Sequence, residues 1–132
     1  MNCLLKFWLK AWNECGEPGA AYALDALFAK GDNAIDVEVE AFGVHIKASD
    51  FESYKQQWKD VFEDLDDVVL SITGDPQLKI SGDRAEISFE LIGDATRADG
   101  SRIVPPPRWR GEHSWRQFDG EWRLVRERLF AI

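Results

Sequence analysis

The sequence has few of the residues that mark disulfide scaffolds, metal centres or cofactor sites. Its cysteines are Cys3 and Cys15 alone, which are too few for a disulfide framework and indicate reduced thiols in a cytoplasmic protein. Its histidines, His45 and His113, have no cysteine or carboxylate at metal-ligand spacing, so we predict no metal site. The chain also lacks a glycine-rich phosphate loop, a dinucleotide fingerprint and a nucleophile motif, and we therefore expect no cofactor.

Basic charge and long apolar runs are also scarce. The chain has 16 Lys and Arg against 24 Asp and Glu, a formal net charge of −8. This balance argues against binding to nucleic acids or to anionic membranes, because both need a basic surface. No apolar run has the length of a membrane-spanning helix, and Lys6 and Lys10 interrupt the apolar start, which does not read as a signal peptide. At 132 residues, the chain fits one domain over residues 1–132.

Apolar residues make up 45% of the chain, and their spacing predicts helices first and strands after. Helical spacing extends over residues 3–14 and 20–30, and a capping box from Ser49 to Glu52 opens a third helix. Strand patterns cover residues 35–42, 68–73, 77–80, 85–92, 108–118 and 121–131. The order α-α-β-α followed by strands predicts an α+β fold, with three helices of the N-terminal half on one face of a curved antiparallel sheet.

The C-terminal hairpin is the most informative stretch for function. Asp119-Gly120 is a strong signal for a two-residue turn between two β-rich runs. Because side chains alternate along a strand, one face of the second run carries Trp122, Leu124, Arg126, Arg128 and Phe130. We predict that this face points inward.

Two arginines on an inward face allow two interpretations. Arg126 and Arg128 either line a cavity for an oxygen-bearing ligand or form internal ion pairs with Glu38, Glu40 or Glu112. Internal pairing is favoured, because an unpaired buried charge is costly.

The facing strand depends on how the turn closes. If it closes with a bulge instead of two residues, a one-residue slip exchanges His113 and Trp115 for Glu112 and Ser114 on the inner face.

Four segments give the chain a resemblance to a known superfamily. They are Ala11-Trp-Asn13, Val37–Gly43, Gly82-Asp-Arg-Ala85 and Phe118–Phe130. The chain resembles the nuclear transport factor 2-like superfamily and, within it, the SnoaL-like and ketosteroid-isomerase-like domains. The resemblance covers nearly the whole chain and implies a conical pocket between the sheet and the helices. The fold hosts isomerases, cyclases, hydrolases, dehydratases and binding modules, so the resemblance does not select one function.

The resemblance also assigns positions to candidate site residues. It places Glu40 at the position of the ketosteroid isomerase base. Trp8 stands where that enzyme has the tyrosine of its oxyanion hole, and Ser114 or His113 stands where it has the aspartic acid. A tryptophan donates a single N–H and reproduces this hole poorly. The Arg126–Arg128 segment replaces a His-X-His of many SnoaL-like relatives and so removes two groups that exchange protons near neutral pH.

Two functions remain open from the sequence. The favoured one is a binding domain for a small, mostly apolar molecule with one acidic or carbonyl oxygen group. The alternative is an isomerase, cyclase or lyase in which Glu40 is the general base, Arg126 or Arg128 stabilises an oxyanion, and His113 transfers a proton. Glu40 also has a simpler interpretation, because three acids on one strand face usually meet solvent.

The predicted pocket is mostly aromatic. Its residues are Trp8, Trp12, Phe28, Phe42, Trp58, Phe62, Phe89, Glu112, Ser114 and Phe130. On the opposite face of the sheet we expect an apolar patch of Val125 and Leu129 with Trp109 or Trp115. Such a patch predicts a two-fold homodimer.

Overall fold

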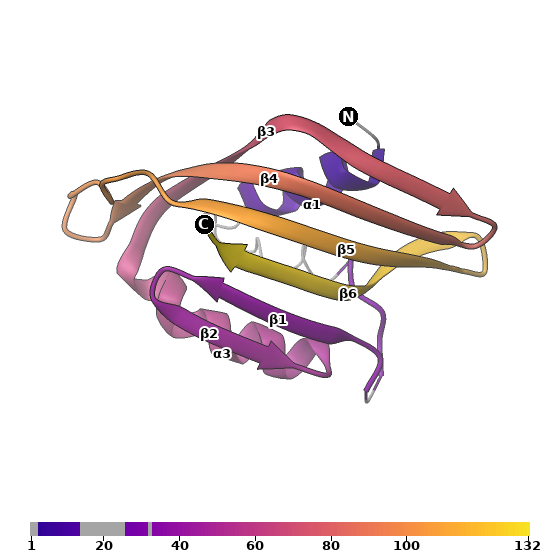
Figure 1. Ribbon diagram of the computed structural model, residues 1–132. Helices are drawn as coiled ribbons and strands as arrows, with labels where there is room; N and C mark the ends of the chain where they lie inside the picture. The colour runs from indigo at the N-terminus through magenta and orange to yellow at the C-terminus, as the bar shows by residue number, and fades with distance from the viewer. Residues whose placement is uncertain (1–2, 14–25, 32) are drawn as a thin grey trace.

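The computed structural model describes residues 3–13, 26–31 and 33–132, in which two helices and six strands form a curved sheet with helices on one side (Figure 1). The helices are α1 (Cys3–Asn13) and α3 (Phe51–Asp64). The strands are β1 (Asp36–Ala41), β2 (Val44–Ala48), β3 (Leu65–Ser81), β4 (Arg84–Arg97), β5 (Arg108–Phe118) and β6 (Glu121–Ala131). The predicted α+β class and the curved sheet are confirmed.

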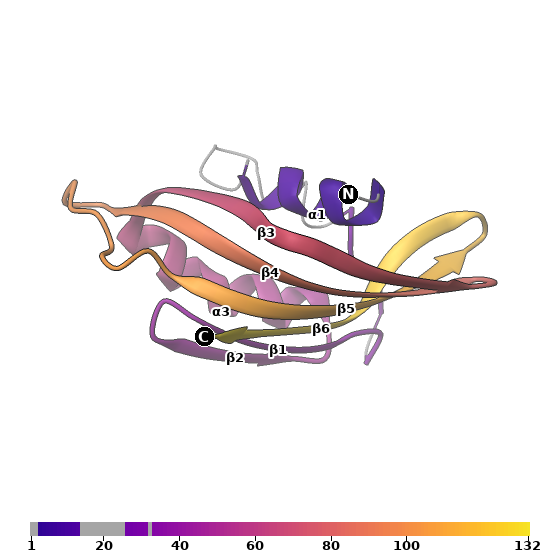
Figure 2. The same cartoon turned by 45° about the horizontal axis from the view of Figure 1, so that its top comes forward.

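The strand order in the sheet is β2-β1-β6-β5-β4-β3. All neighbouring strands are antiparallel except β1 and β6, which run parallel. The first and the last strand of the chain, β1 and β6, therefore lie side by side within the sheet. Figure 2 shows the sheet curving around the side on which the helices lie.

Both described helices bury one apolar face against the sheet. In α1 the buried side chains include Leu5, Trp8 and Trp12, which recur at helical spacing. In α3, Asp50 caps the first turn, because its carboxylate accepts a hydrogen bond from the Ser53 N–H at 2.8 Å. The cap is therefore one residue later than the predicted capping box. Neither described helix combines the length and the apolar character needed to cross a membrane.

Three elements differ from the prediction. Residues 20–25 of the predicted second helix lie outside the described residues, and residues 26–30 are not helical. Instead, Leu27 and Ala29 exchange backbone hydrogen bonds with Leu124 of β6, which overrides their helix propensity. The strand β2 was missed because Ile46 is its one fully buried residue and gives too weak a pattern. The predicted strands 68–73 and 77–80 belong to one strand, interrupted by an irregularity between Thr73 and Gln77.

The β5–β6 turn closes with two residues. Asp119 and Gly120 have φ angles of 51° and 83°, the left-handed conformation required by a type I′ turn. Phe118 and Glu121 are the first pair across the hairpin.

A bulge lies further along the same hairpin. Ser114 pairs with Arg126 and Trp115 pairs with Leu124, so Val125 has no partner on β5. An extra residue on one strand shifts the alternation of side chains beyond it. The two alternatives considered from the sequence thus occur together: a two-residue turn, and a bulge inside the strands.

Candidate functional site

The bulge at Val125 reverses inward and outward positions in the second half of β6. Glu127 and Leu129 are buried at 0% and 4% exposure. Three residues predicted to lie on the inner face point outward instead: Arg126, Arg128 and Phe130. The prediction that they share the inner face with Leu124 is wrong, because the alternation was extended through a position where the strand has one residue too many.

Glu112 and Ser114 face outward with them. They pair in register with Arg128 and Arg126, and directly paired residues lie on the same side of a sheet. Their assignment to the pocket is therefore also wrong. His113 takes the inward position on β5.

Glu40 lies on the solvent-facing side of β1. The alternation of this strand places Val37, Val39 and Ala41 in the core and leaves Glu40 exposed. A carboxylate in this position is hydrated and does not contact the interior of the cone. We therefore drop its assignment as a general base.

Arg128 forms an ion pair on the outer face. Its guanidinium donates to the Asp36 carboxylate at 2.8 Å and to the Asp36 carbonyl oxygen at 3.0 Å. The partner is thus Asp36, and not the predicted Glu38, Glu40 or Glu112. The hydrogen bond from Arg128 holds the pKa of the Asp36 carboxyl below its usual value.

This ion pair predicts a small pH-dependent contribution to stability. A carboxyl whose pKa is lower in the folded state stabilises the fold above its unfolded pKa of about 3.9, and the contribution is lost as the pH falls through the folded value. The Asp36 side chain is 66% exposed, so Asp36→Asn should cost less than about 1 kcal/mol at pH 7. Urea unfolding at pH 7 and pH 3 should show this difference shrinking at the lower pH.

Glu40→Gln is the matched control for that measurement, because Glu40 is an exposed acid on the same face of the same strand. An equal pH-dependent loss in both variants would contradict the specific pairing of Asp36 with Arg128.

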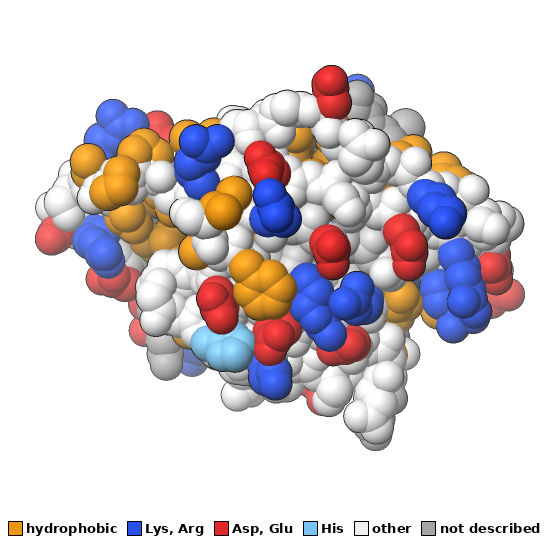
Figure 3. Space-filling model, in the orientation of Figure 1, with side chains coloured by type: hydrophobic (Ala, Val, Ile, Leu, Met, Phe, Trp, Pro, Cys, Tyr) orange, Lys and Arg blue, Asp and Glu red, His pale blue; other side chains and the backbone are white. Residues whose placement is uncertain are grey.

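The outer face of the sheet is charged. Figure 3 shows acidic and basic side chains interspersed over it. The expected apolar patch is absent from the described residues of this face, because Leu129, Trp109 and Trp115 point into the core at 4%, 2% and 1% exposure. The argument for a homodimer based on that patch is therefore wrong.

The polar centre of the interior is a histidine–glutamate pair. His113 Nε2 lies 3.2 Å from Glu127 Oε2, and both side chains have 0% exposure. The pair joins neighbouring strands, since His113 and Glu127 are register partners on β5 and β6. A buried polar or charged group needs a partner, so each of these two side chains favours the position of the other in the core.

Both described helices contribute donors to Glu127. Trp8 on α1 donates its indole N–H to Oε2 at 3.0 Å, and Tyr54 on α3 donates its hydroxyl to Oε1 at 3.2 Å. The carboxylate therefore has three polar partners when His113 is included. It links α1, α3, β5 and β6 at one buried point.

His113 is less completely satisfied. Neither ring nitrogen has a hydrogen bond within the described part of the chain. Nε2 lies at ion-pair distance from Glu127, but its N–H direction does not meet hydrogen-bond geometry. Trp8 and Phe89 each pack edge-on against the ring, with centroids 4.8 Å away. Nδ1 is thus a buried polar atom among aromatic rings.

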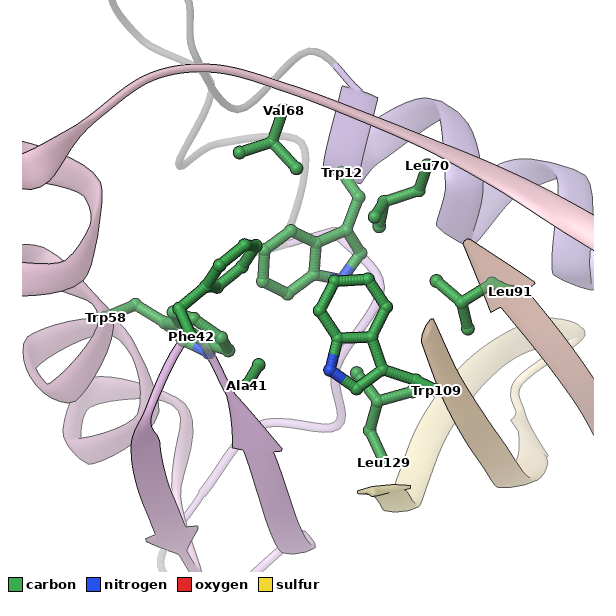
Figure 4. Close-up of a pocket in the computed structure, with 9 residues that line it drawn as sticks. All are labelled: Trp12, Ala41, Phe42, Trp58, Val68, Leu70, Leu91, Trp109 and Leu129. Carbon is green, nitrogen blue, oxygen red and sulfur yellow. The ribbon is translucent and has the colours of Figure 1, made fainter. Parts of the chain in front are cut away.

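A small apolar cavity lies between the sheet and α3, beneath the β1–β2 turn (Figure 4). Its volume is about 10 Å³, at the lower limit for one water molecule. It is lined by Trp12, Ala41, Phe42, Trp58, Val68, Leu70, Leu91, Trp109 and Leu129. All these side chains are apolar or aromatic, and three of them were predicted pocket residues.

Phe42 closes this cavity at the β1–β2 turn. It has a φ of 54° and is only partly buried, and its ring packs edge-on against Trp109 with centroids 5.4 Å apart. Trp109 in turn donates its indole N–H to the Glu40 carbonyl oxygen at 3.1 Å. The cavity is therefore bounded by a fixed indole and by a phenyl ring on a turn.

The Phe89 ring lies over Gly111 and against His113. The inward positions of β5 run Trp109, Gly111, His113. Gly111 has no side chain, and the Phe89 ring occupies the space above it, so that a Cβ built there would lie 2.4 Å from Phe89 Cζ. Along β5, the Phe89 ring thus covers the position between Trp109 of the cavity lining and the buried imidazole of His113.

The other predicted residues have structural positions or are not described. Phe28 is fully buried and packs on Phe51 and Tyr54, with ring centroids 5.6 and 4.9 Å away. The side chain of Phe62 lies outside the described residues. No group of three or more potential metal ligands occurs in the described ranges.

The sequence reasoning missed Glu127 and Tyr54. Glu127 was read as an outward residue between two arginines. The available signal was the spacing of Leu124 and Leu129. Strict alternation places them on opposite faces of the strand, and both face inward only if one residue between them, here Val125, forms a bulge. Tyr54 lies in the helix that the Ser49–Glu52 capping box predicts, but the sequence gives no signal for the partner of its hydroxyl.

Comparison with known proteins supports the fold assignment. No protein-family model matches the sequence, and no curated protein matches it. A nuclear transport factor 2-like superfamily protein from Salmonella enterica has a similar structure at a TM-score of 0.74 and 15% identity, over 96% of this chain and 84% of that one.

Two further solved structures agree. A hexachlorocyclohexane dehydrochlorinase is similar at a TM-score of 0.71 and 11% identity, over 98% of this chain and 82% of its own. A protein of unknown function from Pseudomonas putida is similar at a TM-score of 0.70 and 15% identity, over 98% and 82% of the two chains. The chain therefore has the nuclear transport factor 2-like fold.

Proposed function

We propose that the chain is a binding domain for a small, apolar ring compound, which occupies the interior of the cone next to Trp12, Trp58 and Trp109. The observation that carries this proposal is the cavity lining, which brings aromatic and aliphatic side chains together from seven elements without a polar side chain. Ligand pockets are predominantly apolar. One structurally similar protein is named for an apolar ring compound, hexachlorocyclohexane, which agrees with this ligand class.

Binding requires the cavity to expand. A volume of about 10 Å³ admits no organic molecule. Phe42 is partly exposed and lies on a turn, so its outward rotation enlarges the cavity without breaking a strand pair. The ligand then replaces the contacts of the Phe42 ring with Trp109.

Toluene is a suitable probe of this proposal. We expect the wild-type protein to bind toluene with quenching or shifting of tryptophan fluorescence, because three indoles line the cavity. Phe42→Ala should bind more tightly by about 1–2 kcal/mol, since it removes the ring that must move. Isothermal titration and fluorescence measure both affinities.

Val44→Ala is the control on the same hairpin, because Val44 is 37% exposed and does not line the cavity. It should bind toluene as the wild type does. Absence of toluene binding by the wild type at millimolar concentration would refute the proposal.

The alternative function, an enzyme with Glu40 as general base and Arg126 or Arg128 as oxyanion stabiliser, needs these side chains inside the cone. Glu40, Arg126 and Arg128 all lie on the outer side of the sheet, away from the cavity. Arg128→Ala should therefore leave ligand affinity unchanged, in contrast to the role that the sequence suggested for it.

The two-fold homodimer remains a prediction on different grounds. The outer face carries acids and bases in neighbouring positions, such as Glu90 with Arg110 and Asp36 with Arg128. A two-fold contact of this face brings acids of one copy opposite bases of the other. Light scattering at micromolar concentration should give twice the chain mass of 15.1 kDa at low salt. A mass of one chain would exclude the dimer.

A further inference from the structure

We propose that His113 is the polar anchor of this ligand site and that it selects apolar ring compounds carrying one hydroxyl group. This inference rests on the proposed function and specifies the ligand. It starts from Nδ1 of His113, a buried polar atom that has no hydrogen-bond partner within the described residues. An unpaired polar atom in a core costs free energy, and its presence calls for an explanation such as a ligand.

Glu127 determines the polarity of the anchor. Its Oε2 lies 3.2 Å from His113 Nε2, and a carboxylate at this distance favours the tautomer in which Nε2 carries the proton. In a neutral imidazole of this form, Nδ1 is an acceptor. The matching ligand group is a donor, which in a small apolar molecule is a hydroxyl.

Trp8 and Tyr54 support this assignment. Both donate to the Glu127 carboxylate, so it is held in place and oriented by two helices. In these two bonds the indole N–H of Trp8 and the hydroxyl of Tyr54 both donate to Glu127 and not to His113. His113 Nδ1 remains the acceptor without a partner in this network.

The inward residues of β5 run from the cavity lining to His113. Trp109 lines the cavity, Gly111 follows without a side chain, and His113 is the next inward residue. The Phe89 ring fills the space over Gly111 and touches His113 edge-on. A ligand ring that displaces Phe89 therefore has its apolar body against Trp109 and its substituent near the imidazole.

Histidine ¹⁵N NMR on the wild-type protein tests the anchor directly. The chain has two histidines, and His45 is on the exposed β2 strand, where it serves as an internal control. With phenol we expect the Nδ1 resonance of His113 to shift in the direction of a hydrogen-bonded acceptor, while toluene leaves it unchanged. Neither compound should move the resonances of His45.

Affinity measurements provide a second readout. His113→Phe retains an aromatic ring but has no acceptor. It should weaken phenol binding by about tenfold relative to toluene, the loss expected when one buried hydrogen bond is removed. His45→Phe should leave both affinities unchanged. Benzaldehyde, which accepts but does not donate, should bind no better than toluene.

The outcomes separate the two proposals. Toluene binding with equal effects of phenol and toluene on Nδ1 overturns the anchor but leaves the binding domain intact. A preference for benzaldehyde over phenol also overturns it, because Nδ1 would then be a donor. Failure of both toluene and phenol to bind contradicts the proposed function, and the anchor with it.

Discussion

Glu127→Ala should destabilise the protein by about 3–5 kcal/mol, because each buried polar group that loses its partner costs about 1–3 kcal/mol. Three polar groups lose their partner at once: the Trp8 indole N–H, the Tyr54 hydroxyl and the His113 imidazole. All of them are buried, so water does not readily replace the carboxylate. Urea unfolding followed by circular dichroism measures the loss.

Glu112→Ala is the matched control for this substitution. Glu112 is also a strand glutamate in the same hairpin, but it is exposed on the outer face. Its replacement should change the free energy of unfolding by less than about 0.5 kcal/mol. Similar losses in the two variants would contradict the inward orientation of Glu127.

Gly111→Ala should cost about 1–3 kcal/mol through overpacking. The added Cβ would lie 2.4 and 2.5 Å from two carbon atoms of the Phe89 ring. To relieve the clash, that ring must give up part of its contacts with Trp8 and His113, which pack against it with centroids 5.4 and 4.8 Å away. The same urea unfolding experiment detects the effect.

Phe89→Leu should relieve this clash. Alone it removes ring contacts and should cost about 1 kcal/mol or more, but it also vacates the space above Gly111. The double variant should therefore be more stable than the sum of the two single effects predicts, by about 1 kcal/mol. Additive losses would mean that the Phe89 ring does not cover Gly111.

The fold followed from local patterns that the structure preserves. Helical spacing of Leu5, Trp8 and Trp12 defined α1, and strict alternation from Val37 to Ala41 defined β1. These patterns arise because one face of each element is buried, and they need no knowledge of distant contacts. The element β2 was missed since one buried residue does not make a pattern.

The site was less predictable than the fold, because one residue without a strand partner, Val125, determines which side chains of β6 face inward. Period-2 alternation from Trp122 assigns Arg126 and Arg128 to the interior, and the bulge at Val125 sends them outward and brings Glu127 in. Within this strand, only the odd spacing of Leu124 and Leu129 indicates the bulge. It becomes evident only when β6 is paired with β5 and when partners are sought for His113.

A crystal of the wild-type protein soaked with bromobenzene tests the central claim, that the cone interior is a ligand site for apolar rings, most directly. The account predicts one bromine anomalous peak inside the cone, with the benzene ring against Trp12, Trp58 and Trp109 and the Phe42 ring displaced from its contact with Trp109. Bromine peaks confined to the outer surface, with Phe42 unmoved, would contradict it.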